Sequence, residues 1–229
     1  MIVCSCMAYR REQFAVDEWY HCYNRGVDKR TVFESDNDYR RFVQTIYLSN
    51  NAESTNRFNI KHFEHDRFFE RARGELLVEI GAYCLMPNHF HLLLREHSEG
   101  GITKFMHKLG TSYTMYFNIK HERIGNLFLK PFRSRHVHDD KYFRHVAQYI
   151  HLNSVEIFER GWKQGVVRSI KNLEKNLIAY PYSSYPDYFG SARPEKAILD
   201  PCWMGVLRSE MAPPRELLFD ALQYYENLG

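Results

Sequence analysis

Two histidines stand two residues apart in the run Pro87-Asn88-His89-Phe90-His91-Leu92-Leu93-Leu94. In a β-strand, residues i and i+2 project from the same face, so His89 and His91 could both approach one metal ion while Phe90 and Leu92 face the other way. Histidine is the commonest metal ligand among the side chains. The pattern therefore predicts half of a metal site, although two ordinary histidines on a half-buried strand would give the same pattern.

A phenol and a carboxamide, Tyr149 and Asn153, stand four residues apart in Tyr149-Ile150-His151-Leu152-Asn153. This spacing places them one above the other on a helix. An amide oxygen is a hard ligand that suits Mg²⁺ or Mn²⁺, and two imidazoles with one amide leave coordination positions open for phosphate oxygens. Beside such an ion, the tyrosine oxygen could attack phosphorus and form a covalent phosphotyrosine. The alternatives are a core tyrosine and an asparagine that caps the helix C-terminus.

Three further histidines compete for these roles. His145 lies one helical step before Tyr149, so it is a rival ligand, a proton acceptor or an ordinary surface histidine. His136 and His138 repeat the i, i+2 spacing on a second predicted strand. Nothing in their immediate neighbours distinguishes this pair from His89 and His91, so a wider pattern has to decide.

Strands that alternate with helices have to position these residues. The spacing of apolar residues, with Gly, Pro and capping residues between the runs, predicts strands at 19–24, 76–85, 89–95 and 132–137. It predicts helices at 37–48, at 102–120 and from 139 or 140 to 153. The strands at 76–85 and 89–95 form a hairpin through a tight connection at 86–88. This pattern indicates an α+β sandwich with helices packed on a single sheet.

Two stretches depart from this alternation. Residues 50–74 mix basic residues with phenylalanines in no clear period, so we treat them as an insertion of uncertain structure. Beyond Gly161 the chain is more irregular, with a turn-rich aromatic segment at 180–190 and a final helix predicted at 215–228. We therefore expect a core at 1–160 that contains the insertion, and a mainly helical or irregular extension at 161–229 that packs on it.

The composition is that of a globular protein without a membrane anchor. The formal net charge is +3, from 31 Lys and Arg against 28 Asp and Glu, so bulk charge does not indicate a nucleic-acid binder. Lys130–Arg135 and Arg57–Arg73 mix cations with aromatic rings and are local candidates for binding single strands, although a solvated charged face explains either stretch equally well. Five cysteines without a Cys-x-x-Cys pair, and no long apolar run, favour a cytoplasmic protein.

The sequence as a whole resembles the HUH single-tyrosine transposases, and most closely the REP-associated tyrosine transposases of bacteria. The resemblance spans roughly residues 18–190 and rests on four blocks in the family's order and spacing. They are Tyr20-His21-Cys22-Tyr23-Asn24-Arg25-Gly26, Tyr83-Cys84-Leu85-Met86-Pro87-Asn88-His89-Phe90-His91-Leu92-Leu93, Tyr149-Ile150-His151-Leu152-Asn153 and Tyr180-Pro181-Tyr182-Ser183-Ser184-Tyr185.

This resemblance implies a ferredoxin-like antiparallel sheet and a metal-dependent enzyme that cuts single-stranded DNA beside hairpins and rejoins it. By position it implies that His89 and His91 bind a divalent Mg or Mn ion, that Asn153 completes the site, and that Tyr149 is the nucleophile of a 5′-phosphotyrosine intermediate. Residues 1–160 would then be the catalytic domain. The partners would be single-stranded and hairpin DNA of REP-like elements, with the protein a monomer or a homodimer.

The resemblance also suggests where DNA contacts lie. Arg25, with Gly26, matches a recurring Asn-Arg-Gly element that is structural or contacts DNA, and Lys130, Arg133 and Arg135 are further DNA-binding candidates. Gly125-Asn126-Leu127-Phe128-Leu129-Lys130-Pro131-Phe132 departs from the family's usual element at that place, which puts DNA contacts there in doubt. The insertion is longer than usual, and Asn153-Ser154-Val155 stands where relatives often have Asn-Pro-Val. None of these departures removes a catalytic group.

Two other functions stay open. One is a domesticated, sequence-specific protein that binds DNA hairpins without transposition activity. The other is an unrelated metal-dependent hydrolase that carries His-x-His, but that function gives Tyr149 no necessary role. The intact set of His89, His91, Tyr149 and Asn153 favours the active transposase.

Overall fold

The computed structural model describes residues 13–53, 65–164, 167–212 and 215–218 of the chain. At its centre lies a four-stranded sheet in the order β2-β3-β1-β4, built from β1 (Trp19–Arg25), β2 (Val78–Met86), β3 (His89–Glu96) and β4 (Arg133–Val137). Each neighbouring pair is antiparallel. With helices between β1 and β2 and one long helix between β3 and β4, this is the ferredoxin-like arrangement, which confirms the predicted fold class.

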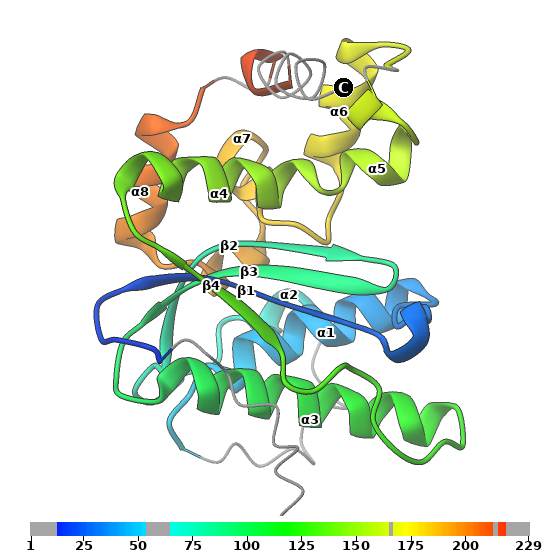
Figure 1. Ribbon diagram of the computed structural model, residues 1–229, viewed down its shortest axis with the longest axis vertical. Helices are drawn as coiled ribbons and strands as arrows, with labels where there is room; N and C mark the ends of the chain where they lie inside the picture. Colours follow the sequence, from blue (N-terminus) through cyan, green and yellow to red (C-terminus); the bar gives the residue numbers. More distant parts are fainter. Residues whose placement is uncertain (1–12, 54–64, 165–166, 213–214, 219–229) are drawn as a thin grey trace, which may run out of the picture.

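Two helices, α1 (Asp36–Ser49) and α3 (Gly101–Lys120), cover one face of the sheet (Figure 1). Apolar side chains of α1 recur at helical spacing, and Phe42 and Ile46 are completely buried. The ring of Phe42 lies 4.8 Å from that of Phe90 in β3. Phe90 thus points toward α1, which confirms that it faces away from its two flanking histidines.

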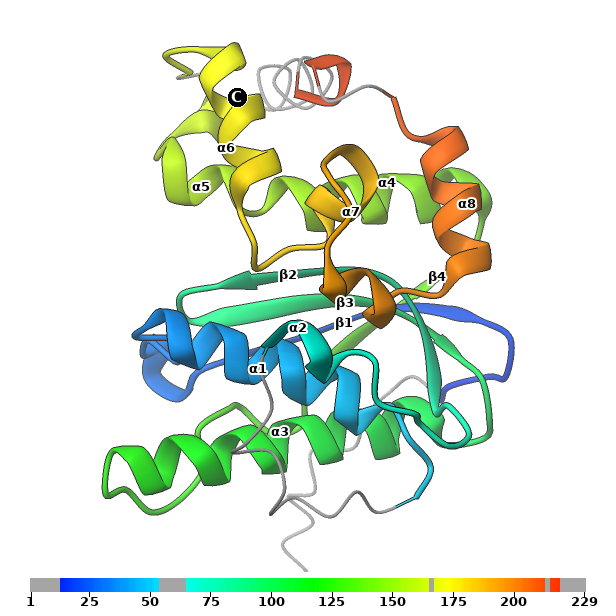
Figure 2. The same cartoon turned by 180° about the vertical axis from the view of Figure 1, so that it is seen from behind.

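The opposite face carries α4 (Asp140–Leu152), as both views of the molecule show (Figures 1 and 2). Asp139 caps this helix, because its carboxylate accepts a hydrogen bond of 2.7 Å from the backbone N–H of Tyr142. Phe143 of α4 packs against Trp19 of β1 with ring centroids 4.8 Å apart. Trp19, His21 and Tyr23 share a face of β1 by alternation, so this face of the sheet looks toward α4.

The remaining segments add short helices. The structure places α2 (His65–Phe68) before β2, and η1 (Val27–Lys29) after β1. After α4 follow α5 (Val155–Phe158), η3 (Trp162–Gln164), α6 (Ile170–Ala179), α7 (Tyr185–Phe189), η4 (Pro194–Ile198) and α8 (Pro201–Glu210). Residues 215–218 are helical, as predicted, and the rest of the expected final helix lies outside the described residues. None of the described helices is long and apolar enough to cross a lipid bilayer.

Part of the predicted insertion belongs to the core. Phe68 and Phe69 are buried, and both rings pack against Tyr47 of α1 at centroid distances of 6.4 and 5.4 Å. The guanidinium of Arg73 lies 4.0 Å from the centre of the same tyrosine ring. The basic and aromatic residues in this part therefore support α1, while 54–64 lie outside the described residues.

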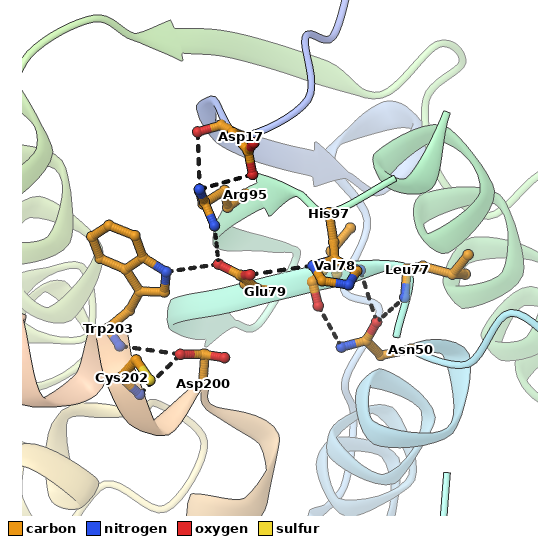
Figure 3. A network of polar contacts seen from close by, with 10 residues as sticks. All are labelled: Asp17, Asn50, Leu77, Val78, Glu79, Arg95, His97, Asp200, Cys202 and Trp203. Atoms are coloured by element: carbon orange, nitrogen blue, oxygen red, sulfur yellow. Dashed lines mark hydrogen bonds and ion pairs between the residues drawn. The ribbon is translucent and has the colours of Figure 1, made fainter. Parts of the chain in front are cut away.

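The C-terminal segments are joined to the sheet at two places. Next to the free edge of β2, the backbone N–H of Leu85 donates to the carbonyl of Tyr182, and the N–H of Ser184 donates to the carbonyl of Tyr83. Near the other end of that strand, the indole N–H of Trp203 in α8 donates to Glu79, which also accepts from Arg95 at 2.8 Å (Figure 3). The C-terminal part therefore packs on the α4 face; the division at residue 160 stays a prediction.

Candidate active site

Three imidazoles and the phenol of Tyr149 meet between the sheet and α4. His89 and His91 project from β3 with ring centroids 5.1 Å apart. The ring of Tyr149, from α4, stands edge-on to His91 at 5.7 Å and to His21 of β1 at 5.8 Å. Tyr149 comes close to this cluster because α4 crosses the face toward which the odd-numbered residues of β1 and β3 point. The structure thus brings together the tyrosine and the histidine pair that the sequence predicts.

Each histidine of β3 has one ring nitrogen engaged by a neighbouring side chain. Nδ1 of His91 lies 2.8 Å from Nε2 of His21 in a buried hydrogen bond, and Nδ1 of His89 lies 2.6 Å from Oδ1 of Asn88. A partner on Nδ1 fixes the orientation of an imidazole and leaves Nε2 as the nitrogen for another ligand. Both rings therefore keep Nε2 as the nitrogen that could bind a ligand.

Burial keeps these imidazoles uncharged. It lowers the pKa of His21 and of His89 to about 4 each, with a smaller contribution from Arg135 for His21 and from Arg25 for His89. Burial, with the neighbouring His21 and His89, lowers the pKa of His91 well below its usual value. At neutral pH each ring is therefore neutral and has one lone pair, which is the form that binds a metal ion.

The phenol of Tyr149 is half-exposed, at 36% of its full accessible area, although the neighbouring Ile150 is completely buried. Burial of its ring raises the pKa of Tyr149, and a hydrogen bond from Asn153 acts in the opposite direction. The residue is therefore neutral at pH 7 and has to lose its proton when it attacks. A core tyrosine, the alternative for this position, would not have this exposure.

Asn153 occupies the C-cap position of α4 and is 4% exposed. Its Nδ2 donates a hydrogen bond of 2.8 Å to the carbonyl oxygen of Tyr149. The capping role that the sequence left open is thus present, and it uses the amide nitrogen. The amide oxygen, the atom that would bind a cation, is not used by this bond.

The donor set fits a catalytic ion better than a structural one. Within the described part of the chain, no three His, Cys, Asp or Glu side chains form a group that could hold a metal. His21 does not supply a third imidazole, because its Nε2 points at Nδ1 of His91. Two Nε2 atoms and one amide oxygen would leave several positions of a six-coordinate Mg²⁺ or Mn²⁺ open for phosphate oxygens and water.

The predicted DNA-binding residues separate into two groups. Across the sheet, Arg25 pairs with His89, Arg135 with His21 and Arg133 with Tyr23, and cross-strand partners share a face. These three arginines are exposed beside the histidine cluster. Lys130 instead lines a groove of about 930 Å³ together with Phe90 and residues of α3, on the opposite face of the sheet. The site therefore has a positive border that does not include Lys130.

The rival histidines lie elsewhere. His136 bonds to Glu18 at 2.9 Å, and its alternation in β4 directs it away from His21. His138 and His145 line a separate depression of about 450 Å³ near the N-terminal half of α4. The structure therefore does not join these three histidines to the Tyr149 cluster.

The glycine after Arg25 has a steric role. A Cβ added to Gly26 would lie 2.5 Å from the carbonyl oxygen of Arg30 and 2.8 Å from Cγ1 of Val32. The chain turns back on itself so closely there that a larger residue would displace backbone. The Asn-Arg-Gly element is thus structural at its glycine, while its arginine lies beside the site.

The sequence of this chain matches the family model for the IS200-like transposases over residues 17–153. The match covers more than half of the chain, begins just before β1 and ends at Asn153, so it contains all the residues of the cluster. This chain belongs to the IS200-like transposase family. Members of this family are transposases, which are enzymes that process DNA.

One solved structure similar to this IS200-like chain is a REP-associated tyrosine transposase bound to a REP hairpin. It shares 14% sequence identity, with a TM-score of 0.46, and the match covers 79% of this chain and 84% of that one. No curated protein sequence matches the chain.

Sequence reasoning gave no role to three residues of this transposase-family site. His21 and Tyr23 lie in a block that the resemblance already included, and Tyr23 packs 5.5 Å from His91. Lys163 of η3 forms an ion pair of 3.4 Å with Glu156, and its charge helps to lower the pKa of His91 after burial and the other imidazoles. Strand alternation could have found His21 and Tyr23, whereas no local pattern indicated Lys163.

Proposed function

We propose that this chain is a metal-dependent endonuclease and strand transferase that cuts single-stranded DNA next to hairpins through Tyr149. The observation that supports the proposal most strongly is the half-exposed ring of Tyr149 standing edge-on to His91, whose Nε2 is left for a ligand. A metal-dependent hydrolase would need the histidines alone. A tyrosine held on a separate helix beside them suits a reaction in which its oxygen forms a bond.

In the proposed cleavage step, Oη of Tyr149 attacks the scissile phosphorus and loses its proton. A bond forms between Oη and phosphorus, and the bond between phosphorus and the 3′ oxygen breaks. The 3′ oxygen takes up a proton and leaves as a hydroxyl, while the 5′ phosphate stays on the tyrosine. Attack of a 3′ hydroxyl on this phosphotyrosine reverses the bond changes and joins two strands without another energy source.

The residues around Tyr149 divide the remaining tasks. His89, His91 and Asn153 would hold a divalent Mg or Mn ion, which polarises the phosphate and stabilises charge on the leaving oxygen when it is bound. The side chains of Arg25, Arg133 and Arg135 attract the backbone phosphates on either side of the scissile bond. Tyr149 itself is protonated at neutral pH before DNA binds, because burial raises its pKa.

The experiment that tests the proposal compares the wild type with Tyr149→Phe on labelled DNA hairpins flanked by single strands, with Mn²⁺ or Mg²⁺. We expect the wild type to form a covalent adduct that survives a denaturing gel. Tyr149→Phe should bind the same DNA in a native gel and form no adduct, because the attacking oxygen is absent. Chelation of the metal should stop cleavage and leave much of the binding.

Tyr142→Phe is the matched control, because Tyr142 lies two turns earlier on α4 and stacks on His138 at 5.0 Å, away from the cluster. It should form the adduct at the wild-type rate. An adduct with Tyr149→Phe would contradict the assignment of the nucleophile. A wild type that binds hairpins yet forms no adduct with either ion would support the domesticated DNA-binding protein instead.

A further inference from the structure

His21 makes contacts that a residue with a purely structural role in the sheet would not need. It is 8% exposed, and its Nε2 lies 2.8 Å from Nδ1 of His91. Its ring also lies 5.8 Å from Tyr149 and 5.0 Å from Tyr23. One side chain therefore contacts both a proposed metal ligand and the proposed nucleophile.

The direction of the hydrogen bond between the two histidines follows from what His91 has to do. A neutral imidazole carries one proton, so His91 can offer a lone pair at Nε2 when its proton is on Nδ1. That proton then needs an acceptor, and Nε2 of His21 occupies this place. His21 must in turn carry its own proton on Nδ1. The bond is therefore compatible with a free lone pair on Nε2 of His91 only when both rings carry their protons on Nδ1.

The position of His21 in the sheet keeps this bond fixed. His21 lies in β1, which pairs with β3 on one side and with β4 on the other, so its backbone is held from both directions. Its cross-strand partners are Leu93 and Arg135, and His91 is the diagonal neighbour. A ring on such a rigid strand presents its acceptor to His91 in one orientation.

We propose that His21 is a positioning residue that holds His91 in the tautomer with a free Nε2 and orients its ring toward the ion and Tyr149. This inference rests on the proposed function, because it concerns the same site, but it makes its own prediction about metal binding. Removing a group that bonds to the other ring nitrogen of a metal-ligating histidine typically changes metal affinity 10- to 100-fold.

Two variants of His21 distinguish the effect of losing the hydrogen-bond acceptor from the effect of changing the ring. His21→Phe keeps a flat ring and removes the acceptor, so we expect the dissociation constant for Mn²⁺ to rise about 10- to 100-fold. His21→Gln keeps an acceptor oxygen, and we expect it to restore most of the affinity. Binding is measured without DNA, from the electron paramagnetic resonance signal of free Mn²⁺. His136→Phe is the matched control, because His136 bonds to Glu18 on the other face.

A second measurement reads the tautomer of His91 directly in the wild-type protein. With ¹⁵N-labelled histidine, long-range ¹H–¹⁵N spectra report the tautomer of each ring, and the signals of His91 are identified by their loss in His91→Gln. We expect His91 protonated on Nδ1 in the metal-free protein. Protonation on Nε2 would overturn the proposal.

The Mn²⁺ titrations also distinguish the two hypotheses. Equal affinity of the wild type and His21→Phe, or affinity of His21→Gln as weak as that of His21→Phe, would contradict the role of His21 alone. A wild type that binds no Mn²⁺ would contradict the metal dependence of the proposed function and, with it, the purpose assigned to His21.

Discussion

Positive charge beside the active-site cluster comes from single residues on adjacent strands. Arg133 and Arg135 are alternate residues of the edge strand β4, and both point to the face that carries Tyr149. A DNA strand whose phosphate lies at Tyr149 would place its neighbouring phosphates along this edge. These arginines would then contribute affinity without reading the base sequence.

The salt dependence of DNA binding tests this arrangement. The double variant Arg133→Gln, Arg135→Gln removes two phosphate contacts, each worth about 0.7 to 0.9 in the slope of log K against log salt. We expect the slope to become shallower by about 1.5, measured by fluorescence anisotropy with a hairpin that carries a single-stranded flank. Lys130→Gln, on the opposite face, should leave the slope unchanged. The reverse result would place the strand along the groove beside α3.

Sequence reasoning identified those candidate residues that lie in pairs on a single strand or helix. His89 and His91 are two residues apart on one strand, and Tyr149 and Asn153 are four apart on one helix, so local geometry is enough to pair them. His21 bonds to a residue 70 positions later in the chain. That contact depends on which strands pair and in what register, and neither follows from spacing within one segment.

Among the elements, α1 and α3 are joined by a buried charge at their ends. Asp38, in the first turn of α1, has a completely buried carboxylate that accepts hydrogen bonds from Lys120 at 2.8 Å and from Tyr116 at 2.9 Å. It also accepts from the backbone N–H of Glu34 and Ser35. Burial alone would raise the pKa of Asp38, but these hydrogen bonds outweigh it and lower the pKa.

This lowered pKa predicts how the stability of the fold depends on pH. A carboxyl group whose pKa is lower in the folded state stabilises the fold above its unfolded pKa of about 3.9, and the stabilisation is lost as pH falls through the folded value. We expect Asp38→Asn to lower the free energy of unfolding by about 1–3 kcal/mol at pH 7, from lost charge-assisted hydrogen bonds. The difference from wild type should shrink below about pH 4.

Urea unfolding at a series of pH values measures this difference. Asp36→Asn is the control, because Asp36 pairs with Arg40 on the surface and both side chains are more than half exposed. It should change stability by less than about 0.5 kcal/mol at any pH in the series. A difference for Asp38→Asn that stays constant from pH 7 to pH 3 would show that its charge does not matter.

The long elements could be predicted from the sequence, and the short ones could not. The helices α1, α3 and α4 and the four strands carry clear apolar periods, and each lies within a few residues of its predicted place. In contrast, α6, α7 and α8 lie in a segment whose apolar residues contact several different elements rather than forming one continuous face. The positions of α7 and α8 depend on partners more than a hundred residues earlier, such as Tyr83, whose backbone bonds to Ser184, whereas α6 packs on its neighbours α5 and α7.

At the scale of the whole molecule, the C-terminal segment connects the tyrosine helix to the sheet. His151, two residues after Tyr149, is completely buried, and its Nε2 lies 2.8 Å from Oγ of Ser184. The same oxygen accepts a hydrogen bond of 2.9 Å from the backbone N–H of Tyr83 in β2. Burial lowers the pKa of His151 to about 3, so this ring is neutral and its bond to Ser184 is between uncharged groups.

Removing the hydroxyl of Ser184 should therefore loosen α4 as well as destabilise the fold. Ser184→Ala leaves the N–H of Tyr83 and Nε2 of His151 buried without a partner, at about 1–3 kcal/mol for each group. We expect the free energy of unfolding to fall by about 2–4 kcal/mol in urea, and peptides covering 140–153 to exchange amide hydrogens faster.

Ser209→Ala supplies the comparison, because the exposed Ser209 bonds to the carbonyl of Val206 within its own helix. It should change neither quantity beyond about 0.5 kcal/mol of stability. If Ser184→Ala destabilised the protein while exchange in 140–153 stayed at the wild-type rate, the C-terminal segment would stabilise the sheet without holding the tyrosine helix. Tyr149 would then owe its position to the packing of Phe143 and Ile150 on the strands alone.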